Sequence, residues 1–358
     1  MTQPLTHAGA RWALIAILVL SAAARIAACF LDAPMYPDEY FQYLEPAWWR
    51  LTGQGIESWE WTDGIRSWAL PGYHGAWLVT LMALGVPKGP PLVWALKVHW
   101  ALVNTALLWV AYRGAAAVAR ARLRRAGTEN AGGEVEAGLL AALLVGAFPG
   151  LVLYSSHTMS EPPSLLCLIA GLTLCVELME PGVDLEARGA HRKALWCGLL
   201  LSLGACIRIA NGPLVLLPPA WLLLRRRYRL LLWLLAGSLV PAALFAFVDL
   251  FTWGKLASSF VAYVKFNFIE GKAADFGTEP PLFYFGELYR RLSWTLGFLL
   301  VPAFWGIRAN WPYLLQALLT IAYLSTQAHK EERFILIMWP LLMIASSGVI
   351  GPWLARVF

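Results

Sequence analysis

Apolar segments of nearly membrane-spanning length follow one another along most of this chain, and they limit the folds that it can adopt. A spanning helix needs roughly 20 mostly apolar residues. Nine segments approach that length: 12–31, 91–112, 137–155, 163–179, 194–210, 230–251, 292–308, 311–328 and 334–355. Only 14% of the residues are charged, against about 25% in soluble proteins. We therefore predict an all-α integral membrane protein, a polytopic helical bundle.

Two shorter apolar segments are ambiguous, and the basic residues decide the topology. Segments 69–86 and 213–224 are short and interrupted by proline. Loops 113–136 and 225–229 are rich in arginine, so the positive-inside rule places both in the cytoplasm. This requires 69–86 to lie along the outer leaflet or dip into it. We expect about ten spans, both termini in the cytoplasm and a retained first span rather than a cleaved signal peptide.

This topology sends the two long polar segments, 32–68 and 252–290, to the non-cytoplasmic side. The cytoplasmic loops are too short for a nucleotide-binding domain, and neither a P-loop nor a dinucleotide fingerprint is present. The net charge of +6 comes from short loops next to spans, which argues against nucleic acid as a partner. The cysteines lie in apolar segments without metal-ligand spacing: Cys29, Cys167, Cys175, Cys197 and Cys206. We expect one membrane domain over 1–358, with no cofactor and no metal.

The first outer segment contains a candidate base. Pro37 followed by Asp38 and Glu39 is typical of a helix start, where the helix dipole favours carboxylates. Spacing of four and seven residues puts Gln42 and Glu45 on the same helical face as Asp38. A capped interfacial helix with a tryptophan anchor would explain these residues without chemistry. The functional alternative is an ionised carboxylate at the membrane surface that accepts a proton.

Two further clusters indicate an anionic ligand. Trp59 and Glu60 precede Arg66, whose guanidinium can grip a phosphate with two hydrogen bonds. The last outer motif consists of five ionisable residues at the start of the final span: His329, Lys330, Glu331, Glu332 and Arg333. Such groups pair with one another or with a charged ligand, although snorkelling to the interface is an alternative. Cations opposite a carboxylate helix indicate a reaction that needs a base.

Weaker candidates lie between these clusters. Arg208 ends an apolar span, so it is a candidate for substrate binding or for a salt bridge to a neighbouring span. His157 and Glu161 share one face of a turn, but a single His with a single Glu is a weak metal site. Asn267 and Glu279 lie in the segment 252–290, which is either a lid over the site or an ordered outer loop.

Four segments in order along the chain resemble the Alg9-like mannosyltransferases (glycosyltransferase family 22). Segments 37–45 and 59–67 resemble that family's Pro-Asp-Glu-x-x-Gln and Trp-Glu-Trp…Gly-Ile-Arg-Ser stretches. Segment 265–280 resembles its Phe-Asn and Tyr-Gly-Thr-His-Pro stretches, and 329–334 matches its His-Lys-Glu-x-Arg-Phe signature. The resemblance implies a GT-C fold with a long first outer loop, and an inverting transfer of a sugar, usually mannose, from a polyprenyl- or dolichyl-phosphate donor.

The resemblance also implies roles for individual residues. Asp38 would be the base, with Glu39 beside it, and it would deprotonate the hydroxyl of a glycan or lipid-linked acceptor. The residues implied to bind the donor phosphate are Arg66, His329, Lys330 and Arg333. The pocket departs from the family pattern at Tyr36, where the family has His, at Glu279, where it has His, and in 156–161. The substrate-binding candidates are Gln42, Glu45, Trp59, Glu60, His157, Glu161, Arg208, Asn267, Glu279, Glu331 and Glu332.

Two other classes compete with a glycosyltransferase. A transporter or flippase for a lipid-linked or anionic solute would place charges near the middle of the membrane on interrupted helices, often in repeated halves. This chain places them mostly at one surface and shows no repeat. A phospho-alcohol or acyl transferase would call for a metal cluster and a Ser or Thr nucleophile. The compact chain favours a bacterial inner (plasma) membrane over an endoplasmic reticulum.

Overall fold

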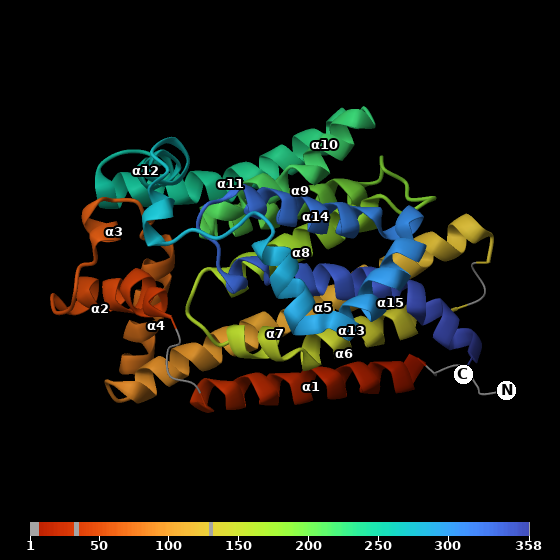
Figure 1. The fold of residues 1–358 in the computed structure, drawn as a ribbon, viewed down its shortest axis with the longest axis horizontal. Helices are drawn as coiled ribbons and strands as arrows, with labels where there is room; N and C mark the ends of the chain where they lie inside the picture. The colour runs from red at the N-terminus through yellow and green to blue at the C-terminus, as the bar shows by residue number, and fades with distance from the viewer. Residues whose placement is uncertain (1–6, 32–35, 129–131, 358) are drawn as a thin grey trace.

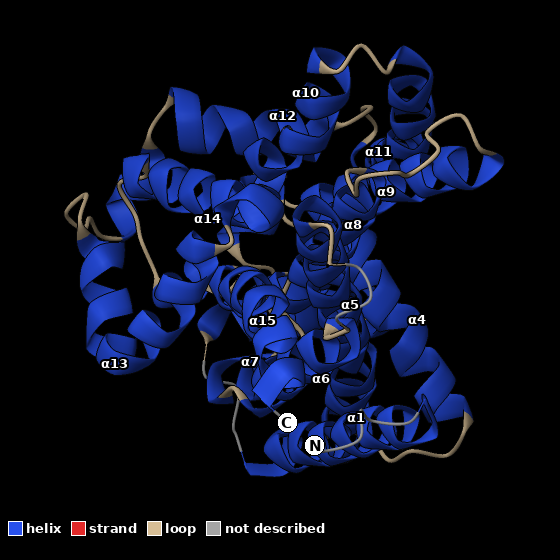
Figure 2. Ribbon diagram, turned by 90° about the vertical axis from the view of Figure 1, so that its right-hand side faces the viewer, coloured by secondary structure: helices blue, strands red, loops and turns tan. Residues whose placement is uncertain are grey.

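The computed structural model describes residues 7–31, 36–128 and 132–357, with only the backbone given for His7 and for 291–296. Every regular element in these ranges is helical (Figure 2), which confirms the predicted all-α class. Long helices run side by side along the long axis of the molecule (Figure 1): α1 (His7–Leu31), α5 (Pro90–Ala126), α8 (Glu161–Leu178), α9 (Arg188–Ile207), α11 (Tyr228–Trp253), α13 (Phe283–Trp305), α14 (Ile307–Thr326) and α15 (Met338–Val357).

Five of the described helices are long and apolar enough to cross a membrane, in accord with a membrane protein. They are Ala8–Leu31, Pro90–Ala126, Glu161–Leu178, Tyr228–Trp253 and Glu332–Val357. Helices α9, α13 and α14 coincide with three other predicted spans, but the helices at these positions do not meet the same criteria of length, hydropathy and charge. The last span lies at the centre of the bundle, since 89% of its most apolar 18-residue stretch is buried inside the protein. In α11 the buried share of the corresponding stretch is 17%.

Two predicted boundaries were wrong. The predicted span 137–155 is broken into α6 (Glu134–Ala147) and α7 (Pro149–Tyr154), because Pro149 has no amide hydrogen to continue the first helix. The predicted loop 113–136 is helical as far as Ala126, where Gly127 ends α5 in a left-handed conformation. Alanine and arginine are strong helix formers, and Glu177 accepts two hydrogen bonds from the guanidinium of Arg113 at 2.9 and 2.8 Å.

The two ends of the bundle differ in character (Figure 1). One end, the basic end, holds the start of α1, the last turns of α5, the loop 225–229 and the end of α15. The opposite end, the site end, holds short helices: η1 (Glu39–Leu44), α2 (Glu45–Thr52), α3 (Trp59–Thr62), α12 (Ser258–Val264), η4 (Lys265–Ile269), η5 (Lys272–Phe276) and η6 (Glu332–Ile335). The structure therefore separates the arginine-rich segments from the polar segments, as predicted.

The ambiguous segments adopt short helices. Segment 69–86 forms α4 (Ala69–Ala83), which lies across the site end rather than along the bundle (Figure 1). This arrangement agrees with the expectation that it does not cross the membrane. Segment 213–224 begins within η3 (Ile209–Val215) and continues as α10 (Leu217–Leu224), which is too short to span.

Helices α9 and α11 pack in close contact because glycines lie between them. A Cβ atom on Gly198 would overlap the carbonyl group of Leu234, and one on Gly237 would overlap the carbonyl group of Leu195. Small residues of this kind let helices approach closely where the bilayer supplies no hydrophobic force between them. The scaffold under the site end therefore depends on glycine at both positions.

We expect Gly198→Ala to lower the free energy of unfolding by about 1–3 kcal/mol, since overpacking forces backbone shifts. Gly189→Ala is the matched control, because Gly189 lies in the same helix with open space where its Cβ would be. Thermal unfolding of both variants in lipid nanodiscs measures the difference. Equal melting temperatures would contradict the close packing of α9 and α11.

Candidate active site

A large cavity opens at the site end, and elements distant in sequence line it. Its volume is about 710 Å³. Ten of the residues singled out from the sequence line it: Asp38, Gln42, Trp59, Glu60, Arg66, Arg208, Asn267, His329, Glu331 and Arg333. Seven others lie outside its lining: Glu39, Glu45, His157, Glu161, Glu279, Lys330 and Glu332. The fold thus brings together the first outer segment, the end of α9, the second outer loop and the last motif.

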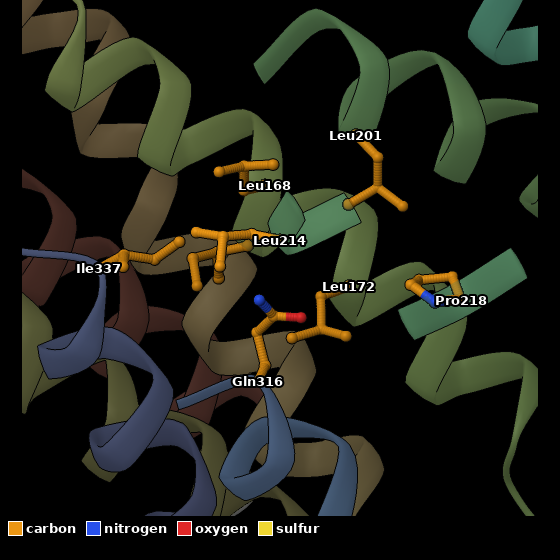
Figure 3. Close-up of a pocket in the computed structure, with 8 residues that line it drawn as sticks. Leu168, Leu172, Leu201, Leu214, Pro218, Gln316 and Ile337 are labelled. Carbon is orange, nitrogen blue, oxygen red and sulfur yellow. The ribbon is translucent and has the colours of Figure 1, made fainter. Parts of the chain in front are cut away.

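A second cavity lies inside the bundle and cannot serve as a ligand site. Figure 3 shows apolar side chains of α8, α9, η3 and α10 around the amide of Gln316. Its volume is about 10 Å³, which is room for about one water molecule. The bundle is closely packed around this cavity, which has no room for a ligand larger than a water molecule.

Asp38 stands at the entrance to η1, and its carboxylate faces the cavity. It is the residue before the first turn of η1, a π-helix, and Pro37 precedes it. About a third of its side chain is exposed (33%). One carboxylate oxygen accepts a hydrogen bond from Nη2 of Arg333. Asp38 is therefore both open to a ligand and held in place by a cation.

Glu39 points the opposite way, into the protein. It is fully buried and accepts hydrogen bonds from the backbone amide of Thr158 at 2.9 Å and from its hydroxyl at 3.2 Å. Its second oxygen lies 2.8 Å from Nδ1 of His157. Burial alone would raise the pKa of Glu39. This pKa is nevertheless held below its usual value by the hydrogen bond and charge of His157, the charge of Lys97 and the hydrogen bond from the Thr158 amide. Glu39 therefore fixes η1 to the turn 155–160. His157 is the hydrogen-bond partner of Glu39 in this turn and does not line the cavity.

The predicted common face of Asp38, Gln42 and Glu45 is only partly present. The π-helical turn of η1 shifts the register, so Gln42 lines the cavity beside Asp38 but Glu45 does not. Oε1 of Glu45 instead accepts a hydrogen bond from the backbone amide of Ile56 at 3.1 Å. Glu45 thus holds the loop between α2 and α3, and its role is structural in this arrangement.

Arg333 joins the first outer segment to the last motif. Its Nη2 donates to Asp38 and, at 2.8 Å, to Oε1 of Glu331, while its Nε lies 3.5 Å from Oε1 of Glu161. Its guanidinium carbon lies 4.8 Å from the centre of the Tyr36 ring. Only 6% of Arg333 is exposed, so three carboxylates and an aromatic ring hold one buried cation in a single position.

Glu331 and His329 complete this ion cluster. Nε2 of His329 lies 3.1 Å from Oε1 of Glu331, and this hydrogen bond raises the pKa of His329. Burial would raise the pKa of Glu331, but hydrogen bonds with His329 and Arg333 lower it to about 2. Both residues line the cavity. Glu331 is a carboxylate that holds His329 and Arg333 in place, and the imidazole of His329 is the member of the pair that can donate a hydrogen bond to an anion.

Arg208 is the second arginine that lines the cavity. It forms a salt bridge to a neighbouring span, which was one of the two roles considered from the sequence. Its Nη1 lies 2.8 Å from Oε1 of Glu161, at the start of α8. Glu161 is 5% exposed and therefore holds Arg208 and Arg333 from behind the cavity wall. The guanidinium of Arg208 also packs 4.8 Å from the centre of the Phe334 ring.

A third arginine approaches the cavity from the first outer segment. Arg66 donates from Nε at 3.1 Å and from Nη2 at 2.6 Å to Oε1 of Glu60, which also accepts from Gln42 at 3.3 Å. Burial would lower the pKa of Arg66, but the charge of Glu60 outweighs it and raises this pKa. Arg66 is therefore permanently charged, and Glu60 fixes its position.

The structure turns Lys330 away from the cavity. Its ammonium group donates to the carbonyl oxygen of Glu279 at 2.8 Å and to that of Gln327. The backbone amide of Glu279 donates to the carbonyl oxygen of Ala328 at 3.1 Å. Lys330 and Glu279 thus tie the second outer loop to the last motif, and the predicted contact of Lys330 with a phosphate is not present in this arrangement. The side chain of Glu332 is exposed.

The second outer loop is ordered into short helices and forms one wall. Asn267 lines the cavity, with its amide donating to the carbonyl oxygen of Tyr263 at 3.0 Å. Phe266 and Phe276 line it as well and contact the ring of Trp59. Among the described residues, His, Cys, Asp and Glu nowhere form a group of three or more that could hold a metal ion.

The family of the chain follows from a comparison with known protein families. The model of the Alg9-like mannosyltransferase family matches residues 16–357, which is nearly the whole chain. The chain belongs to the Alg9-like mannosyltransferase family. The motifs in 37–45, 59–67, 265–280 and 329–334 therefore converge on one cavity of a family member, and the resemblance found in the sequence is confirmed. No solved structure matches the chain.

Several relatives are similar over most of this chain. A GPI mannosyltransferase 3 from Yarrowia lipolytica is 28% identical over 348 residues, which cover 93% of this chain and 62% of the relative. A GPI mannosyltransferase 3 from Drosophila melanogaster is 25% identical over 96% of this chain and 57% of its own length. The mouse alpha-1,2-mannosyltransferase ALG9 is 27% identical over 90% of this chain and 52% of its own length.

The chain therefore spans between about half and two thirds of the length of these family members. All three come from eukaryotes, so they lend no support to the expected bacterial inner membrane. The membrane character itself agrees with the five apolar helices.

Sequence reasoning missed some residues of the candidate site. Phe41, Ser58, Phe266 and Phe276 line the cavity but had no assigned role, whereas Tyr36 lines it as expected. Lys97, on the spanning helix α5, is 1% exposed, and its charge lowers the pKa of Glu39. A lysine inside the apolar segment 91–112 was a signal for such a role, because ionisable residues within spans are costly and usually functional.

Proposed function

We propose that this chain is a glycosyltransferase that transfers a sugar, mannose in the first instance, from a lipid-phosphate donor to a glycan or lipid-linked acceptor. One observation carries the proposal: the exposed carboxylate of Asp38 shares a cavity with the guanidinium groups of Arg66, Arg208 and Arg333. A base beside several fixed cations suits a reaction in which a hydroxyl loses a proton and a phosphate leaves. The relatives named above are all mannosyltransferases, which supports mannose as the sugar.

The proposed step is a single displacement with inversion at the sugar. The acceptor hydroxyl oxygen attacks the anomeric carbon, and a new carbon–oxygen bond forms as the bond from that carbon to the phosphate oxygen breaks. Asp38 takes the hydroxyl proton. The leaving lipid phosphate keeps the bonding electrons, and the cavity arginines stabilise its charge. His329 lines the same cavity and can donate a hydrogen bond to the leaving phosphate.

We place this reaction on the non-cytoplasmic face of the membrane. The arginine-rich basic end, with residues 120–127 and 225–229, faces the cytoplasm by the positive-inside rule. The cavity lies at the opposite end of the bundle, where a donor carried by a membrane lipid can reach it. The charged residues that line the cavity lie at one end of the bundle rather than in its middle, which also favours transfer over transport.

The test is transfer of radiolabelled mannose from polyprenyl-phosphate-mannose by the purified protein in lipid nanodiscs. A panel of mannosides and glycolipids serves as acceptors. We expect a labelled product with inverted stereochemistry at the anomeric carbon, and no product from a nucleotide-mannose donor. Product from the nucleotide donor alone would contradict the proposed donor class. A folded protein that transfers from none of several lipid-phosphate sugars would contradict the proposed reaction.

A further inference from the structure

Three aromatic rings form a cluster on the wall of the cavity. The ring of Trp59 stacks on that of Phe276, with centroids 5.4 Å apart and planes inclined by 14°. It also lies 5.2 Å from the ring of Phe266. Trp59 comes from α3, whereas Phe266 and Phe276 come from η4 and η5 of the second outer loop. We call these three residues the aromatic platform.

Two rings of the aromatic platform are exposed and that of Phe266 is half-buried, whereas the nearby Trp61 is buried. Trp59 is 41% and Phe276 55% exposed. Trp61, two residues further on, is 1% exposed and packs on Trp68 and Trp253 in the interior. Large aromatic rings that line a cavity and remain open to it are typical of ligand-binding walls. Packing of the scaffold accounts for Trp61, and it leaves the exposure of Trp59 unexplained.

The groups around the aromatic platform suit a water-soluble ligand rather than a hydrocarbon chain. Glu270 bridges Lys265 at 3.4 Å and Lys272 at 2.9 Å, and the ammonium group of Lys272 lies 5.7 Å from the centre of the Phe266 ring. Covering these exposed charges with a prenyl chain would cost free energy. A pyranose ring fits better, because one of its faces consists of C–H groups while its edge carries hydroxyls.

We propose that the aromatic platform binds a sugar ring of the acceptor by stacking, and that this positions its hydroxyl for Asp38. This inference rests on the proposed function and names the acceptor subsite within it. The neighbour of Trp59, Glu60, holds Arg66, so the acceptor sugar lies next to one of the cations assigned to the donor phosphate. Gln42 and Asn267 line the same cavity and offer amide groups for the sugar hydroxyls.

Binding of methyl α-D-mannopyranoside, followed by saturation-transfer NMR, tests this subsite without any turnover. Lipid nanodiscs are required, because sugar-headed detergents would compete. We expect Trp59→Ala and Phe276→Ala to weaken binding roughly tenfold each, since an aromatic stack contributes on that order. Trp59→Phe should retain most of the binding. Trp353→Ala is the matched control, since Trp353 is 60% exposed on α15, outside the cavity lining.

The outcomes separate this inference from the proposed function. Loss of the saturation-transfer signal in both alanine variants but not in Trp353→Ala, at unchanged melting temperature, supports the aromatic platform. Equal signals in wild type and Trp59→Ala, or no signal in wild type, overturn it even if the enzyme transfers mannose. A wild-type protein that binds the mannoside through Trp59 but transfers no sugar overturns the proposed function and leaves the subsite standing.

Discussion

Replacing Asp38 by Asn should lower the rate of sugar transfer by about 10²–10⁴-fold, the usual contribution of a positioned base. The amide keeps the shape of the carboxylate and retains an oxygen that accepts the hydrogen bond from Arg333. It has no charge with which to take a proton from an acceptor hydroxyl. Transfer measured in nanodiscs with saturating donor and acceptor should therefore fall in turnover, while the melting temperature changes little, because the Asp38 side chain is 33% exposed.

Glu39→Gln is the matched control, since it makes the same chemical change at the adjacent residue. Glu39 lies outside the cavity lining and bonds to Thr158 and His157. A glutamine can still accept from the Thr158 amide and keep a hydrogen bond with Nδ1 of His157. We expect its transfer rate to fall far less than that of Asp38→Asn. The reverse ranking, with Asp38→Asn active and Glu39→Gln inactive but folded, would assign the base to Glu39.

Replacing Arg333 by Gln should lower the free energy of unfolding by about 3–5 kcal/mol, as expected when one partner of a buried ion pair is removed. Arg333 is 6% exposed and neutralises a cluster that contains Asp38, Glu161 and Glu331. The change also breaks the link between η1 and the last motif. Thermal unfolding in nanodiscs measures the loss, and sugar transfer should be abolished with it.

Two comparisons show whether the loss comes from the buried charge. Arg229→Gln removes an arginine whose side chain is 70% exposed and lies 3.9 Å from Glu186, so it should cost no more than about 1 kcal/mol. The double variant Arg333→Gln, Glu161→Gln removes one charge of each sign and should recover part of the stability. Equal costs for Arg229→Gln and Arg333→Gln would contradict the ion cluster.

Arg333→Lys separates charge from geometry. A lysine keeps the positive charge but presents a single ammonium group, whereas the guanidinium of Arg333 reaches several carboxylates at once. We expect this variant to be more stable than Arg333→Gln and still to bind the lipid-phosphate donor poorly. Full activity of Arg333→Lys would show that the position needs a charge and no particular geometry.

The sequence by itself determined the class of the fold and the family, and it predicted which segments line the candidate site. Apolar segments of about 20 residues require helices in a bilayer, because only a helix or a closed barrel satisfies every backbone group there. The arginine-rich segments predicted which end of the bundle lacks the site, and the four motifs predicted the family. Each of these inferences depends on local composition or on residues adjacent in sequence, so each could be made without coordinates.

Only the tertiary structure decided which side chain of each motif faces the cavity. Asp38 and Glu39 are adjacent in sequence, yet only Asp38 lines the cavity. Glu39 points into the protein, because the π-helical turn of η1 orients it toward its partners in 157–158. Lys330 and Arg333 are three residues apart. Lys330 nevertheless donates to the carbonyl oxygen of Glu279 in the second outer loop, whereas Arg333 donates to Asp38, which is 295 residues away in sequence. Such choices depend on contacts between segments far apart in sequence, and the packing of the whole bundle brings those segments together.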